Sequence, residues 1–199
     1  VYFMFQLFRS SALAGFTIGL AGFGYLTIGG VPGAVVFAFG LLTVIAYKLK
    51  LFTGTAGFIK KDEAPTLLLI LLGNVTGCLT VALLTRLSPN DLQTVAQTIM
   101  QGRIENGALR SGMLAIGCGF IMTTSVTFAR EKNYLPLLFG VPLFIFCGFP
   151  HCLVDAFYVM TSPVDFIKDN ITDLLATYGC VVLGNFIGCN LYRTVLPEK

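Results

Sequence analysis

Five long stretches of this chain contain no charged residue, and they limit the possible fold more than any other feature of the sequence. They lie between Arg9 and Lys48, Glu63 and Arg86, Arg110 and Arg130, Lys132 and Asp155, and Asp173 and Arg193. A helix that crosses a bilayer needs about 20 apolar residues. The first stretch is long enough for nearly two such helices, and the glycine- and proline-rich segment 29–33 supplies a turn within it. The sequence therefore predicts six spans, near residues 10–29, 33–59, 65–86, 109–129, 134–161 and 174–193.

The composition supports a chain that lies in lipid. Hydrophobic residues make up 55% of it, charged residues only 12%, and the mean hydropathy is +0.82. A soluble domain of this length needs more charge to stay in water. The net charge of +3 is too small to indicate nucleic-acid binding. The six cysteines lie inside apolar stretches at spacings that fit no zinc motif, so we expect buried thiols, with no metal site and no cofactor.

Two of the spans contain sequence that suits no unbroken helix. The second holds Lys48, Lys50 and the segment Leu51–Thr55, and the fifth holds Gly148-Phe149-Pro150-His151, in which the proline removes a helical hydrogen bond. Irregular backbone at membrane depth is tolerated only where it is buried in protein or lines a polar cavity. Both breaks are therefore candidates for the functional centre.

Basic residues indicate the orientation of the chain. If the N-terminus is inside, the cytoplasmic ends of the spans carry seven of them: Arg9, Lys60, Lys61, Arg130, Lys132, Arg193 and Lys199. The opposite ends carry four basic residues: Arg86, Arg103, Arg110 and Lys168. Most of the acidic residues also lie at these opposite ends. Since positive charge collects on the cytoplasmic side, both termini are predicted to be cytoplasmic.

The third and sixth spans share the motif L-G-N-x-x-G-C, at Leu72–Cys78 and Leu183–Cys189. Small residues at this spacing can simply pack helices. Each half of the chain, however, also has a glycine-rich first span and a broken second span. The order of these matches predicts two repeats, about residues 10–86 and 109–195, in a single transmembrane domain of residues 1–199. With three spans per repeat, the second repeat must be inverted, as in channels and transporters whose site lies near the midplane.

Three motifs, taken in order along the chain, resemble the formate/nitrite transporter family. They are L-F-T-G at Leu51–Gly54, G-F-x-H at Gly148–His151 and G-N-x-x-G at Gly184–Gly188. The resemblance covers essentially the whole chain. It implies an aquaporin-like, all-α membrane fold of six transmembrane helices, with helices two and five broken. It also implies a homopentamer in the cell (inner) membrane with one pore in each subunit.

The resemblance implies roles for single residues as well. Thr53 and His151 match the family's central threonine and histidine in the dry middle of the pore. The apolar constrictions on its two sides match five residues: Phe37, Leu41, Leu51, Met122 and Phe144. Asn185 matches the asparagine of the sixth span, and Phe52 belongs to the L-F-T-G motif. Three basic residues are assigned to the vestibules: Lys50 at the first break, and Arg103 or Arg110 in place of a vestibule lysine that has no direct match.

The chain departs from the family pattern at four positions. Lys50 and Pro150 stand where Glu is common, and Asp155 and Gly119 where Asn is found. These departures bear on which anion is carried more than on membership. Asp155 lies four residues after His151, on the same face of the following half-helix. We expect it to pair with a lysine or to bond across the repeat interface, and we assign it no role in transport.

His151 is the only histidine of the chain. An ionisable residue inside a membrane is a functional candidate by default, and imidazole can titrate near neutral pH. An anion that loses its water in an apolar constriction is strongly destabilised, which favours uptake of a proton. We hypothesise that His151 supplies or relays that proton, while Thr53 donates a hydrogen bond to the imidazole or to the anion. The predicted function is pH-dependent transport of formate, nitrite or a similar small monovalent anion.

Other readings stay open at this point. An aquaporin-like pore for small neutral solutes would use paired Asn-Pro-Ala motifs, which neither break carries. A structural subunit of a membrane complex would have no evident use for two polar breaks. An intramembrane enzyme is improbable on residue types, since the spans carry one histidine and no paired carboxylates. Taken singly, His151 and Thr53 can also be purely structural residues.

Overall fold

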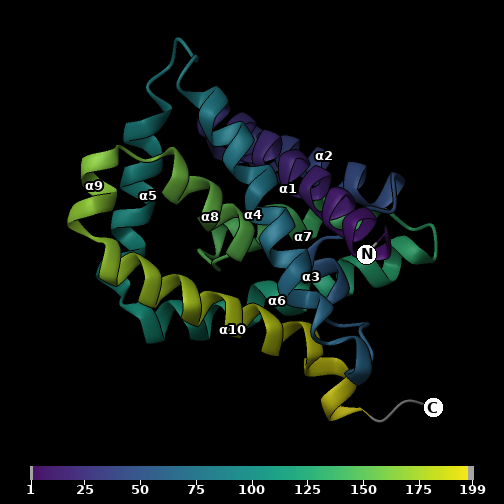
Figure 1. Ribbon diagram of the computed structural model, residues 1–199. Coiled ribbons are helices and arrows are strands. Elements are labelled where there is room, and N and C mark those ends of the chain that lie inside the picture. The colour runs from purple at the N-terminus through teal and green to yellow at the C-terminus, as the bar shows by residue number, and fades with distance from the viewer. Residues whose placement is uncertain (1, 197–199) are drawn as a thin grey trace.

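The computed structural model describes residues 2–196; Lys199, counted above among the cytoplasmic charges, lies outside them. The described residues form helices and no strand, so the predicted all-α fold is confirmed (Figure 1). In chain order the helices are α1 (Tyr2–Ile28), α2 (Gly30–Ala46), α3 (Phe52–Thr55), η1 (Lys61–Glu63), α4 (Thr66–Thr85), α5 (Leu92–Asn106), α6 (Ala108–Arg130), α7 (Leu135–Phe146), α8 (Cys152–Thr161), α9 (Val164–Asp169) and α10 (Ile171–Val195).

Four of these helices are long and apolar enough to cross a membrane, namely α1, α4, α6 and α10. The second and fifth predicted spans are interrupted where the sequence indicates. In the second span α2 ends at Ala46 and α3 begins only at Phe52. In the fifth, α7 ends at Phe146 and α8 begins at Cys152. The half-helix after the first break is a single turn, so the second span is helical over a shorter length than predicted.

Helix α5 has no counterpart in the sequence analysis, which places no element between residues 86 and 109. Its side chains are mostly polar, so it carries no signal of a membrane span. Asp91 caps it by accepting a hydrogen bond from the Thr94 N–H at 3.1 Å, which satisfies a donor of the first turn. It packs against α8, beside the second break (Figure 1).

Two helix pairs form the frame of the protein: α1 lies along α4, and α6 lies along α10 (Figure 1). Glycines of the shared motif allow their close approach. A Cβ added to Gly77 of α4 would overlap the carbonyl oxygen of Ala12, and one added to Gly188 of α10 would overlap that of Ile116. Small residues permit such backbone contact where lipid supplies no hydrophobic drive between helices. The short helices α3 and α8 each touch both pairs, so the breaks lie at the centre.

The helices before the two breaks end in the same way. A 6→1 hydrogen bond joins the Leu49 N–H to the Val44 carbonyl at 2.8 Å, and another joins the Phe149 N–H to the Phe144 carbonyl at 3.0 Å. This Schellman-type ending requires one residue in the left-handed region. Lys48 takes that place in the first half with φ +52°, and Gly148 takes it in the second with φ +67°.

Replacing Gly148 with alanine is expected to lower the free energy of unfolding by about 1–2 kcal/mol, because an L side chain is strained in the left-handed region. No atom lies within 4 Å of the added Cβ, so backbone strain is the whole effect. Denaturant titration of the purified protein measures it. The control is Gly102→Ala, inside α5 and equally unobstructed, which should raise stability by about 0.5–1 kcal/mol. Equal shifts for the two variants would contradict this account.

Candidate pore site

Asn185 holds the second break in place. Its Oδ1 accepts a hydrogen bond from the Cys152 N–H at 2.8 Å. Its Nδ2 donates to the carbonyls of Pro150 at 3.0 Å and Ala115 at 2.9 Å. The side chain is fully buried. One amide thereby satisfies an N–H at the start of α8, a carbonyl that the proline turn leaves without a helical partner, and a carbonyl of α6.

Asn74 makes the same three bonds in the first half. Its Oδ1 accepts from the Phe52 N–H at 2.9 Å, and its Nδ2 donates to the carbonyls of Lys50 at 2.8 Å and Ser11 at 2.7 Å. From the sequence, Asn74 is apparent only as part of the shared motif. The missed signal was the repetition itself, because Asn185 was given a supporting role and Asn74 is its counterpart.

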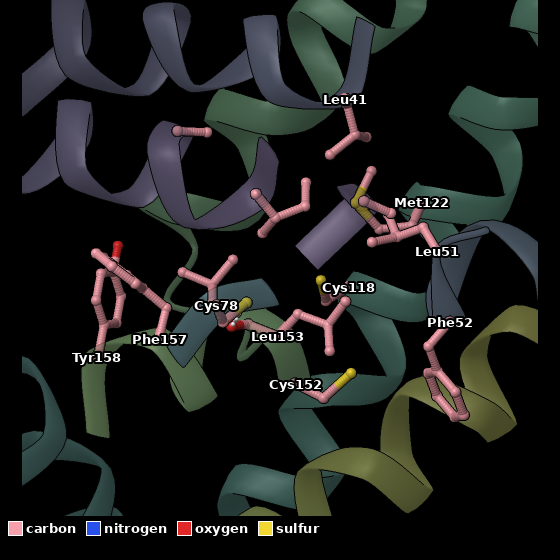
Figure 2. Packing of buried hydrophobic residues seen from close by; sticks show 14 of the residues in the cluster. Leu41, Leu51, Phe52, Cys78, Cys118, Met122, Cys152, Leu153, Phe157 and Tyr158 are labelled. Atoms are coloured by element: carbon pink, nitrogen blue, oxygen red, sulfur yellow. Dashed lines mark hydrogen bonds between the residues drawn. The ribbon is translucent and has the colours of Figure 1, made fainter. Parts of the chain in front are cut away.

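The cysteines of the shared motif connect each half to the break of the other half. The single S–H of Cys78 is shared between the Gly15 carbonyl at 3.3 Å and the Leu153 carbonyl at 3.5 Å. The Cys189 thiol donates to the Thr53 carbonyl at 3.4 Å. Figure 2 shows Cys78 beside Leu153 in the packed centre. Cys118 and Cys152 are also buried as expected, whereas Cys180 is half-buried and Cys147 is exposed.

Thr53 and His151 meet between the two breaks. The Thr53 Oγ1 lies 3.0 Å from the His151 Nε2, and both side chains are buried, with exposed fractions of 0% and 2%. By the matched bonds above, His151 occupies the position of Leu51 in the other half, and Thr53 that of Leu153. The polar pair therefore joins non-equivalent positions of two similar breaks.

The hydrogen bonds of His151 define which ring nitrogen carries the proton. Its Nδ1 accepts from the Leu153 N–H at 3.3 Å, which caps helix α8. Because Nδ1 is an acceptor, the proton of the neutral ring lies on Nε2, and Nε2–H donates to the Thr53 Oγ1. The imidazole is therefore the donor and Thr53 the acceptor. The opposite direction, with Thr53 donating to the imidazole, was one of the two options expected from the sequence. The observed direction leaves the Thr53 hydroxyl hydrogen available to a bound anion, the other option.

Buried aromatic side chains lie next to the pair. The Phe37 and Phe144 rings meet edge to face with centroids 6.1 Å apart, and the Phe144 centroid lies 5.8 Å from that of His151. Three further buried side chains, Leu41, Leu51 and Met122, gather at one place in Figure 2. Phe37 thus lies beside Phe144, and Leu41 lies near Leu51 and Met122; that these five residues form constrictions stays a prediction of the resemblance. Phe52 instead points away from the Leu41 cluster, toward α10 (Figure 2).

The charged residues of the sequence analysis lie farther out. Lys50 is exposed, and its N–H bonds to the Ser10 Oγ at 3.2 Å. Arg110 is exposed near the start of α6. Arg103 is partly buried, and its Nε lies 3.4 Å from the Asp155 Oδ2. Of the two alternatives expected for Asp155, the lysine partner is wrong: its charged partner is an arginine of α5, a helix in the segment between the two predicted repeats.

Comparison with known proteins decides the family. Residues 3–197 match the family described as formate/nitrite transporter. The chain belongs to the formate/nitrite transporter family. Among solved structures, a pentameric formate channel with formate bound is similar with a TM-score of 0.81 and 20% identity, over 96% of this chain and 95% of that one. An FNT family ion channel gives a TM-score of 0.76 and 22% identity, over 97% and 91%. No curated protein matches the chain.

Membership in the formate/nitrite transporter family makes the chain an integral membrane protein of a transport family. The similar structures establish the fold. Because they are less than 25% identical to this chain, the roles of the site residues must be argued from this chain's own geometry. A family of transporters also agrees with the prediction that the protein is not an enzyme.

Proposed function

We propose that the protein conducts small monovalent anions of weak acids, such as formate or nitrite, across the membrane in a pH-dependent way. The observation that carries the proposal is the buried Thr53–His151 hydrogen bond of 3.0 Å. The Phe144 ring centroid lies 5.8 Å from that of His151, and Phe37, Leu41, Leu51 and Met122 belong to the same buried apolar cluster as Phe144. A hydroxyl hydrogen is available there to bind an anion oxygen, while the apolar side chains exclude water and large solutes.

The surrounding electrostatics favour an anion that can become neutral. An anion stripped of water between apolar side chains is destabilised by several kcal/mol or more. The N-terminus of α8 presents its positive dipole end at the site, where His151 is the N-cap. This partial charge stabilises an arriving anion. The neutral acid passes the apolar constrictions more easily than the anion does. Only the anion of a weak acid can take up a proton near neutral pH, so such anions are the natural substrates.

His151 can supply that proton only from its doubly protonated form. The resting ring carries one proton, on Nε2, and accepts the Leu153 N–H at Nδ1. A second proton on Nδ1 therefore breaks this bond and weakens the cap of α8. From the imidazolium, Nε2–H passes to the Thr53 Oγ1 as the hydroxyl proton passes to the anion. The ring ends neutral with its proton on Nδ1, and exchange of one proton restores the resting form.

The proposed assembly is a homopentamer with one pathway in each subunit, in the cell (inner) membrane. A similar structure is a pentameric formate channel. Both termini are proposed to be cytoplasmic, and residues 1–199 to form one transmembrane domain of two inverted repeats, about 10–86 and 109–195. The matched bonds of Asn74 and Asn185 support the repeats.

Uptake into proteoliposomes tests the proposal. Purified protein is reconstituted, and influx of formate, nitrite, hydrosulfide, lactate and acetate is compared across a range of external pH, after subtraction of protein-free liposomes. Sulfate and glycerol serve as a divalent anion and a neutral solute. We expect saturable uptake of at least one weak-acid anion that increases as the pH falls, without uptake of sulfate. Glycerol flux without anion flux would instead support an aquaporin-like pore.

A further inference from the structure

Arg103 bridges the two sides of the second break. Its Nη1 donates to the Gly148 carbonyl at 2.8 Å, where α7 has ended. Its Nε lies 3.4 Å from the Asp155 Oδ2, in the first turn of α8. His151 lies between these two anchor points in the chain. A single guanidinium from α5 therefore fixes the backbone before His151 and the helix after it.

Burial makes this bridge necessary. The Asp155 side chain is 3% exposed and the Arg103 side chain 15%. Among the described residues, neither carboxylate oxygen has a hydrogen-bond partner, so the nearby guanidinium is the group that compensates the charge. A buried carboxylate without a countercharge is strongly destabilising. The arginine side chain also suits two anchors at once, since its planar fork presents several donors, whereas lysine presents one compact ammonium.

Only the break that carries the histidine is built in this way. By the matched bonds of the two halves, Gly148 corresponds to Lys48 and Asp155 to Thr55, so the first break offers no carboxylate for such a bridge. Leu51 stands there in the place of His151. The Arg103 bridge is thus found at the break that contains His151 and is missing from the break that contains Leu51. This difference indicates that the bridge does more than hold the end of a helix.

We propose that Arg103 is a positioning residue for His151 and that Asp155 is the anchor of Arg103. Asp155 thereby has a role in the site, whereas none was expected from the sequence. This proposal rests on the proposed function of His151. The rival reading is that Arg103 acts only as a vestibule charge that attracts anions. The rival predicts that arginine and lysine are interchangeable at residue 103, since both carry the charge.

The single histidine permits a direct test that needs no transport. Protein labelled with ¹⁵N-histidine gives the ring signals of His151 alone, and these report the tautomer and the titration. We expect the Nε2–H form in the wild type at neutral pH, and a mixture of tautomers or a displaced titration in Arg103→Lys and Asp155→Asn. Arg9→Lys, a change of the same kind at an exposed residue of α1, should leave the signals unchanged. Arg103→Lys keeps the charge that Asp155 needs, so the fold is retained.

Transport provides the second measurement. We expect Arg103→Lys to lower the maximal anion uptake by about tenfold, as loss of a charge-assisted hydrogen bond does, and to alter its pH profile. Ring signals and uptake of Arg103→Lys that equal those of the wild type would overturn the inference. So would a higher substrate KM as the sole change. Absence of anion flux in the wild type would overturn the proposed function instead, and the ring signals would still decide the positioning role.

Discussion

Replacing Asn185 with leucine is expected to lower the free energy of unfolding by about 3–5 kcal/mol. Leucine has a similar volume but forms no hydrogen bonds. The Cys152 N–H and the Pro150 carbonyl then lose the partner that Asn185 provides, inside the fully buried centre. Each unsatisfied buried group is destabilising by about 1–3 kcal/mol, and the lost bond to α6 adds to this. Unfolding in detergent by a denaturing surfactant, followed by circular dichroism, measures the change.

Two further substitutions test the reason for this loss. Asn190 lies on the same helix, but its Nδ2 bonds only to the Phe186 carbonyl one turn earlier, so Asn190→Leu should change stability by less than about 1 kcal/mol. Asn74→Leu should match Asn185→Leu, because the bonds of the two asparagines correspond. If all three variants were equally stable, the asparagines would not be what holds the breaks.

Replacing Thr53 with valine is expected to reduce anion uptake about ten- to a hundredfold, and to lower the free energy of unfolding by about 1–3 kcal/mol because the buried His151 Nε2–H loses its acceptor. Valine has the shape of threonine, but it removes both the acceptor of the His151 Nε2–H and the hydroxyl that we propose binds the anion. A hydrogen bond to a charged group contributes about 1.5–3 kcal/mol, and each 1.4 kcal/mol at the barrier is a factor of about ten. Initial rates of uptake into proteoliposomes measure the loss.

The matched control is Thr43→Val on α2. The hydroxyl of Thr43 bonds to the Phe39 carbonyl of its own helix at 2.9 Å, so its removal should leave uptake within about twofold of the wild type. Thr53→Ser keeps the hydroxyl and should retain most of the activity. Normal uptake by Thr53→Val would show that the hydroxyl takes no part in transport.

The sequence predicts the breaks because their causes are local. Pro150 cannot continue a helix. The lysines near Leu51 cannot face lipid as part of an unbroken membrane-spanning helix. The repeated motif predicts that Asn74 and Asn185 are equivalent. It does not predict their role, since the carbonyls and N–H groups that they bond come from segments up to 70 residues away.

Other parts of the site depend on contacts without a sequence pattern. The Arg103–Asp155 pair joins residues on different helices, and no periodicity relates them. The protonated nitrogen of His151 follows from the backbone N–H of Leu153, which only the cap geometry shows. Helix α5 escaped prediction because a polar linker helix is recognised by its cap and packing rather than by hydropathy.

The pH dependence of formate uptake in wild type and His151→Asn tests the central claim most directly. Asparagine can still accept the Leu153 N–H as a helix cap, but it cannot carry a proton at neutral pH. After subtraction of protein-free liposomes, wild-type uptake should rise as the external pH falls. The variant, shown to be folded and assembled, should lose that rise and transport at least about tenfold more slowly at low pH. A variant with the wild-type rate and the wild-type pH profile would contradict a proton role for His151.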